Sequence, residues 1–209
     1  MQELLDVNRW RSTLASALPG EVAHERMSPT FRGTFEHVAE PVRAAVMILI
    51  YPHRDQLYTV FIKRNEYDGP HSGQVSFPGG ATEKGDLTME ATALRETREE
   101  LGINGDIDIL GSLTPLHIPV SNFLVAPVVG WTPVRPDFHP DPSEVQYLIE
   151  VPIRSLLAPE NVAREKISRH GRIIDTPYYR TGEEKIWGAT AMIMSEFLQL
   201  AARLLPHRC

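Results

Sequence analysis

The feature that most constrains this chain is a predicted helix over residues 86–101, with a glycine turn before it and a glycine stop after it. Asp86 suits the N-cap position, and Gly102 suits the left-handed residue that ends a helix. Alanine and leucine, which are good helix formers, fill part of its interior. The run Pro78-Gly79-Gly80 shortly before it predicts a tight turn. The sequence therefore predicts a helix with defined ends, around which the rest of the chain is arranged.

Three carboxylates share one side of this helix near its C-terminal end. Glu96 and Glu100 are four residues apart, and Glu99 lies three residues after Glu96, so the side chains are neighbours. Like charges at this spacing repel by about 0.2–0.5 kcal/mol per pair, and acids at a helix C-terminus meet the negative end of the helix dipole. Arg95 and Arg98 offset part of this repulsion. A divalent cation would offset far more.

The carboxylate cluster is a candidate metal site. Carboxylate oxygens suit hard cations such as Mg²⁺ or Mn²⁺, and Mg²⁺ is usually held by one or two carboxylates together with waters and substrate phosphates. No histidine or cysteine stands beside the cluster, so the sequence argues against zinc. The alternative is a solvated acidic helix face, which is the commoner use of such a pattern.

These residues resemble the Nudix box, in which a glycine, five residues, an acid and seven residues precede Arg-Glu-aliphatic-any-Glu-Glu-any-Gly-aliphatic. Gly79-Gly80 match its start, and its second half is matched by Arg95, Glu96, Glu99, Glu100, Gly102 and Ile103. The chain departs from the pattern twice. Eight residues, one more than usual, separate Asp86 from Arg95, which leaves the role of Asp86 open, and Thr97 stands where a larger apolar residue is usual.

The loop before the box resembles the coenzyme A pyrophosphatase branch of this family. Arg64 is followed nine residues later by Gly73 and then by the run QVSFPGG, and this branch also has the longer spacing inside its box. The match is partial. Val60-Phe61-Ile62 replaces the usual Leu-Leu-Thr, and Gly69 replaces a second arginine. The resemblance covers roughly residues 44–202.

The resemblance implies hydrolysis of a diphosphate with Mg²⁺ or Mn²⁺ as cofactor. It implies that Glu96 and Glu100 are metal ligands and that Glu99 is a ligand to a further ion or a catalytic base. The carbonyl group between Gly80 and Ala81 is a further candidate ligand. Positive charge is needed because diphosphate oxygens are already anionic and repel nucleophiles.

Five other residues receive roles from the same resemblance. Arg95 is expected to orient a box glutamate through a salt bridge, and Glu144, in a distal loop, to act as general base. Arg64, Gly79 and Gly80 are expected to bind the substrate. Glu144 and Arg64 have a simpler alternative, because a loop glutamate and an arginine at a strand end are often just solvated.

Lys63 is a weaker candidate for phosphate binding than its neighbour Arg64. It stands at the end of a predicted strand, where a solvated lysine is the commoner finding.

Composition predicts one domain over residues 1–209, with residues 1–20 as an N-terminal helical extension that ends at Pro19-Gly20. The chain is 42% hydrophobic and 23% charged, which is ordinary for a globular protein. Its net charge of −6 argues against binding to nucleic acid or an anionic membrane surface. The single cysteine, Cys209, excludes an internal disulfide and favours a cytoplasmic location. The N-terminal helix is expected to pack on the domain or on a second subunit, which leaves a homodimer open.

Alternating and apolar runs predict a chain of mixed strands and helices. Strands are expected over residues 42–51, 57–63, 74–77, 107–113, 122–131, 147–151 and 178–187, with an edge strand over 31–35 and a hairpin over 164–174 that turns at His170-Gly171. Helices are expected over residues 152–157 and 189–205. The pattern alone gives an α/β or α+β fold, and the resemblance implies an α/β/α sandwich around a mixed sheet, with the box helix on one face.

Three functions stay open on the sequence, each with a small-molecule nucleotide as partner. The resemblance favours a coenzyme A pyrophosphatase that releases 3′,5′-ADP and 4′-phosphopantetheine. A Nudix hydrolase for ADP-ribose or another nucleotide is the second, since Pro119 stands about where that branch carries a marker proline. The third is a non-catalytic nucleotide-binding regulatory module, against which the presence of all three box glutamates counts.

Overall fold

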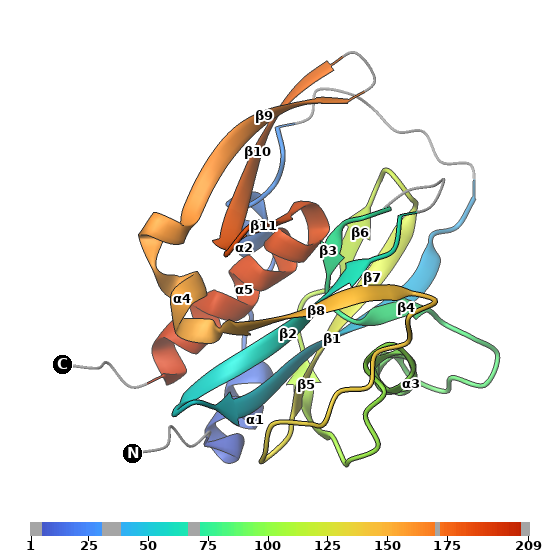
Figure 1. The fold of residues 1–209 in the computed structure, drawn as a ribbon. Helices are drawn as coiled ribbons and strands as arrows, with labels where there is room; N and C mark the ends of the chain where they lie inside the picture. Colours follow the sequence, from blue (N-terminus) through green and yellow to red (C-terminus); the bar gives the residue numbers. More distant parts are fainter. Residues whose placement is uncertain (1–5, 31–38, 67–71, 170–171, 206–209) are drawn as a thin grey trace.

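The structure is a computed structural model that describes residues 6–30, 39–66, 72–169 and 172–205 (Figure 1). The edge strand expected over residues 31–35 and the turn at His170-Gly171 lie outside these ranges. The helices are α1 (Val7–Leu14), α2 (Glu21–Glu25), α3 (Met89–Leu101), α4 (Ile153–Leu157), the 3-10 helix η1 (Pro159–Asn161) and α5 (Gly188–Leu204). The strands are β1 (Val42–His53), β2 (Gln56–Arg64), β3 (Val75–Ser76), β4 (Gly79–Ala81), β5 (Asp108–Ser112), β6 (Leu116–Ile118), β7 (Phe123–Trp131), β8 (Val145–Pro152), β9 (Val162–Arg169), β10 (Arg172–Thr181) and β11 (Glu184–Trp187).

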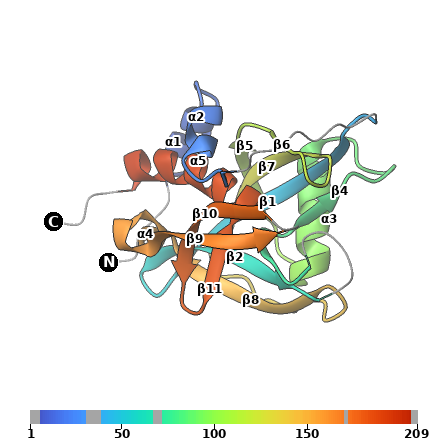
Figure 2. The same ribbon diagram turned by 90° about the horizontal axis from the view of Figure 1, so that it is seen from above.

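A mixed sheet forms the centre of the fold. Its main strand order is β3-β2-β1-β7-β5, and β4, β6 and β8 pair with β1, β7 and β2 respectively. β1 and β7 run parallel, whereas the other pairs are antiparallel. A second, three-stranded antiparallel sheet, β11-β10-β9, lies on the α5 side of the molecule (Figures 1 and 2).

The central strand β1 is buried on both of its faces. Successive side chains of a strand point to opposite faces. Ala45, Met47 and Leu49 accordingly belong to a cluster with Ala93 and Leu101 of α3. The residues between them belong to a second cluster with α5. The sheet therefore lies between helices, as expected for an α/β/α sandwich, with α3 on one face.

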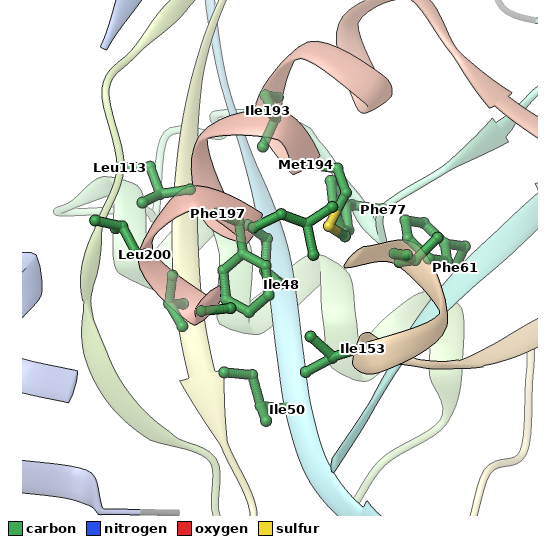
Figure 3. Packing of buried hydrophobic residues seen from close by; sticks show 14 of the residues in the cluster. Ile48, Ile50, Phe61, Phe77, Leu113, Ile153, Ile193, Met194, Phe197 and Leu200 are labelled. Atoms are coloured by element: carbon green, nitrogen blue, oxygen red, sulfur yellow. The ribbon is translucent and has the colours of Figure 1, made fainter. Parts of the chain in front are cut away.

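The α5 face holds the larger apolar cluster. Figure 3 shows buried side chains of the sheet and its connecting segments meeting those of α4 and α5: Ile48, Ile50, Phe61, Phe77, Leu113, Ile153, Ile193, Met194, Phe197 and Leu200. α1 covers part of this face, because Trp10 stacks on Phe197 with 5.3 Å between ring centroids. The apolar side of α1 thus packs on its own chain, which is one of the two arrangements expected for it.

The predicted N-terminal helix was too long. Within the described part, α1 ends at Leu14, and a separate short helix follows Gly20. Pro19 disfavours a helical conformation at the residue before it, and the Gly20 N–H donates to Glu196 of α5 at 2.9 Å. Both features separate α1 from the helix that follows.

The prediction also missed two short strands, one of them at the expected turn Pro78-Gly79-Gly80. β4 includes Gly79-Gly80 and pairs with β1, while β6 pairs with β7. No helix in the described ranges is long and apolar enough to cross a bilayer.

Candidate active site

The N-cap of the box helix α3 lies two residues later than expected. Thr88, rather than Asp86, is the N-cap, and its side chain accepts a hydrogen bond from the Ala91 N–H at 3.2 Å. The other end is as expected, because Gly102 adopts φ 63° and ends the helix. Thr97, which stands where the box usually has a larger apolar residue, is fully buried on the inner side of α3.

Asp86 binds an arginine instead of capping the helix. Its carboxylate accepts hydrogen bonds from Arg95 at 3.0 and 3.3 Å, from Thr92 at 3.0 Å and from the Glu83 N–H at 3.0 Å. The bond from Arg95 is the largest cause that lowers the pKa of Asp86 to about 2. Asp86 therefore has a defined role in spite of the extra residue before Arg95: its carboxylate binds the guanidinium of the box arginine.

Arg95 connects Asp86 to the box glutamates. Its Nη1 atom donates to Glu96 Oε1 and to Glu99 Oε2, each at 2.9 Å, and its Nη2 atom donates to the Ala81 carbonyl at 3.1 Å. The guanidinium thus holds the carboxylates of one helix turn in place. This is the arrangement expected of a residue that orients the glutamates.

Glu100 is the most deeply buried acid of the box, with a relative exposure of 1%. It accepts a hydrogen bond from the Gly79 N–H at 2.7 Å, and the Arg64 Nη1 atom lies 3.4 Å from its other oxygen. Burial raises the pKa of Glu100 to about 8 in spite of these two donors, and the carboxylates of Glu96 and Glu144 add to the rise. Burial and the neighbouring carboxylates thus outweigh the two donors, so the Glu100 carboxylate has too little positive charge around it.

Gly79 and Gly80 allow β4 to come close to both β1 and α3. A Cβ atom on Gly79 would overlap the Ala45 carbonyl, and its φ of 152° is strained for other residues. A Cβ atom on Gly80 would overlap the carboxylate of Glu96. The two glycines therefore make room for the Glu100 hydrogen bond and for the Glu96 side chain.

The distal loop that carries Glu144 reaches the C-terminal end of α3. The N–H groups of His139 and Asp141 donate to the carbonyls of Leu101 and Glu100, at 2.9 and 3.2 Å, which satisfies carbonyls left free at the helix end. The exposed Glu144 lies close enough for its charge to contribute to raising the pKa of Glu96 as well as that of Glu100. The tertiary structure thus brings Glu144 to the box.

Arg64 and Lys63 point to different places. Arg64 contacts Glu100, whereas Lys63 forms an ion pair with Glu184 of β11 at 2.9 Å. Glu184 also accepts a hydrogen bond from the Tyr147 hydroxyl. Only Arg64 of this pair therefore lies at the box, and Lys63 joins the two sheets.

The donor set fits Mg²⁺ or Mn²⁺ in its chemistry. Glu96, Glu99 and Glu100 offer hard oxygen ligands from one turn of helix, and the buried Glu100 has too little positive charge around it. Glu96 and Glu99 are held by Arg95 in this arrangement. In the described ranges no three acidic, histidine or cysteine side chains converge on one point as metal ligands.

Comparison with known proteins gives the family of this chain. Residues 41–170 match the NUDIX domain. The chain belongs to the Nudix family. It is 37% identical over 130 residues to the Nudix hydrolase NudL of Photorhabdus laumondii, covering 62% of this chain and 69% of that one. It is also 35% identical over 170 residues to the human mitochondrial coenzyme A diphosphatase NUDT8, covering 78% of this chain and 71% of that one.

Solved structures confirm the Nudix fold. The Nudix hydrolase RenU of M. smegmatis superimposes with a TM-score of 0.55 at 12% identity, covering 82% of this chain and 92% of its own. The MutT protein of Methanosarcina mazei Go1 does so with a TM-score of 0.51 at 16% identity, covering 80% of this chain and 99% of its own.

Sequence reasoning missed several parts of this site. The partners of Asp86 and Glu100 come from other segments, and spacing along the chain does not reveal them. The Gly79-Gly80 pair was a usable signal for a close backbone approach. Nothing in the sequence pointed to Asn65, which directly follows Arg64 and binds the loop of Glu144.

Proposed function

We propose that this Nudix hydrolase cleaves the diphosphate of coenzyme A, with Mg²⁺ or Mn²⁺, to 3′,5′-ADP and 4′-phosphopantetheine. The observation that carries this proposal is the 35% identity to the coenzyme A diphosphatase NUDT8, which extends over 78% of the chain. The sequence from Arg64 to Gly80 supports the same substrate, because it resembles the signature of that branch.

In this proposal the carboxylates hold the ion. Glu96 and Glu100 would be its ligands, and Glu99 would bind a second ion or serve as a base. When bound, the ion supplies positive charge that offsets the anionic diphosphate and makes a coordinated water more acidic. Arg95 keeps Glu96 and Glu99 in place through its two 2.9 Å hydrogen bonds.

The remaining residues would act on substrate and water. Glu144 accepts a proton from the attacking water as a P–O bond forms and the bridging P–O bond breaks. Arg64 and the backbone at Gly79 and Gly80 lie beside Glu100, where they would contact phosphate oxygens.

Product analysis tests the proposal. Purified protein is incubated with Mg²⁺ or Mn²⁺ and, separately, with coenzyme A, 3′-dephospho-coenzyme A, ADP-ribose and a panel of nucleoside triphosphates. Appearance of 3′,5′-ADP and 4′-phosphopantetheine, lost on chelation of the metal and with coenzyme A giving the highest kcat/KM, is the expected result. Turnover of ADP-ribose alone would contradict coenzyme A as the substrate and would still support metal-dependent hydrolysis of a diphosphate. Binding of these nucleotides without turnover would favour a regulatory module.

A further inference from the structure

Asn65 joins the end of β2 to the loop that carries Glu144. Its backbone N–H donates to the Glu144 carbonyl at 3.1 Å, and its side-chain Nδ2 atom donates to the Pro142 carbonyl at 3.0 Å. Its own carbonyl accepts from the Gly73 N–H at 3.3 Å. Asn65 is therefore bonded both to the distal loop and to the segment that leads into the box.

Residues 141–145 form a turn that is held together by several internal hydrogen bonds. The Asp141 carboxylate accepts from the Ser143 N–H at 2.8 Å and from its hydroxyl at 2.7 Å. The Asp141 carbonyl accepts from the N–H groups of Glu144 and Val145 at 3.2 and 2.8 Å. A shift at Pro142, inside this turn, is thus passed on to Glu144.

Both partners of this contact are fixed relative to the same box glutamate. Arg64, the residue before Asn65, lies 3.4 Å from the Glu100 carboxylate. The Asp141 N–H donates to the Glu100 carbonyl at 3.2 Å. The contacts therefore form a ring: Glu100 contacts Arg64, the next residue Asn65 binds the loop at Pro142, and the loop binds Glu100 again through Asp141. Glu144 belongs to the loop part of this ring, through the hydrogen bond between its carbonyl and the Asn65 N–H.

We propose that Asn65 is a positioning residue whose side-chain amide holds Pro142, and through it Glu144, where Glu144 takes the proton of the attacking water. This inference rests on the proposed function. A general base must stay within hydrogen-bond reach of the proton that it accepts, and a misplacement of about 1 Å can cost about 100-fold in rate. The backbone bond from Asn65 survives a change of side chain, so the loop would shift without detaching.

A double-mutant cycle tests this link. We expect Asn65→Ala to lower kcat by about 10-fold with little change in KM, since substrate contacts remain. Asn65→Asp keeps the size, lacks the donor and should behave in the same way. In a Glu144→Gln background, Asn65→Ala should cost less than about 2-fold, because the residue it positions is already gone. Equal losses in both backgrounds would overturn the proposal.

Asn161 provides a matched control. Its side-chain amide donates to the Ser155 carbonyl at 2.7 Å, which is the same kind of bond at a place remote from the box. Asn161→Ala should change stability by a similar amount and leave kcat unaltered. If Asn161→Ala lowered kcat as much as Asn65→Ala does, the loss would be a general effect of destabilisation. That result would contradict the positioning role of Asn65.

Hydrogen exchange gives a readout that needs neither metal nor substrate. In Asn65→Ala the amides of Glu144 and Val145 should exchange faster than in the unmodified protein, whereas Asn161→Ala should leave them unchanged. Unchanged exchange in Asn65→Ala would overturn the proposal. If the substrate panel gave no turnover, the proposed function would fail, and this measurement would still decide whether Asn65 holds the loop.

Discussion

Two buried glutamates lie on opposite faces of the central sheet, and their surroundings differ. Glu196, on α5, is fully buried and accepts four hydrogen bonds, from the Gly20 N–H, from His24 and from the N–H and hydroxyl of Thr114. Burial raises its pKa, but the bonds from His24, Thr114 and Gly20 outweigh this and leave the pKa below the ordinary value. Glu100, on α3, is nearly as buried, yet its pKa is raised.

The difference lies in how fully each charge is satisfied. The donors around Glu196 are neutral groups and a histidine, which come from α2 with its N-cap and from Thr114, so its charge stabilises the fold. Glu100 has one short bond from Gly79 and a longer contact with Arg64, and other carboxylates lie nearby. A fold tolerates such a deficit where a ligand will supply the missing charge. We therefore assign Glu196 to stability and propose Glu100 as a ligand of the site.

The largest expected effect is on turnover after Glu100→Gln. Loss of a carboxylate ligand should lower kcat by about 1,000-fold, since a bound metal contributes several kcal/mol of charge stabilisation. The thermal midpoint should fall less than that of Glu196→Gln, because Glu196 accepts four hydrogen bonds that an amide would partly lose, whereas Glu100 accepts one short bond and one longer contact. Steady-state kinetics and thermal unfolding measure the two quantities. Near-normal turnover with normal metal dependence would remove Glu100 from the ligand set.

The complementary change, Glu196→Ala, should act on stability alone. It leaves the buried donors of Gly20, His24 and Thr114 unpaired, at a cost of about 3 kcal/mol in the free energy of unfolding. Denaturant unfolding measures this loss, and kcat at a temperature where the variant is folded should stay unchanged. A large fall in kcat would mean that the two glutamates do not divide stability and activity as their surroundings indicate.

A smaller loss of activity is expected for Gly80→Ala. The added methyl group would meet the Glu96 carboxylate, which must turn away from its place, and kcat/KM should fall by about 10- to 100-fold. Gly85→Ala is the matched control, because a Cβ atom there meets nothing within 4 Å. Equal activity of the two variants would show that the position of Glu96 does not matter.

The smallest effect concerns pH. The pKa of Glu196 is lower in the folded protein than its ordinary value of 4.5, so the unfolded chain binds more protons in this range. The stabilisation by Glu196 is therefore complete above pH 4.5 and is lost as the pH falls through the lowered pKa. The difference in unfolding free energy between the unmodified protein and Glu196→Gln should shrink on acidification. A difference that stays constant with pH would contradict the assigned pKa direction.

The sequence was most informative where neighbouring residues determine structure. The helix stop at Gly102 and the side shared by Glu96, Glu99 and Glu100 follow from helix geometry and were correct. Most long strands were placed within a few residues, because their apolar runs are buried on the sheet. The predicted start of the box helix was wrong. Asp86 and Thr88 both have side-chain oxygens that suit an N-cap, and Asp86 binds Arg95 instead, which leaves Thr88 as the N-cap.

The sequence by itself determined that the chain has a mixed α/β fold of the Nudix family and which carboxylates line one side of its box helix. Only the tertiary structure decided what each carboxylate faces. Glu100 meets Gly79 and Arg64, and Glu144 arrives from a distant loop. The physical reason is that local spacing fixes which side of a helix a residue occupies. Burial and hydrogen-bond partners depend on segments far away in the chain, and these set the charge balance on which chemistry depends.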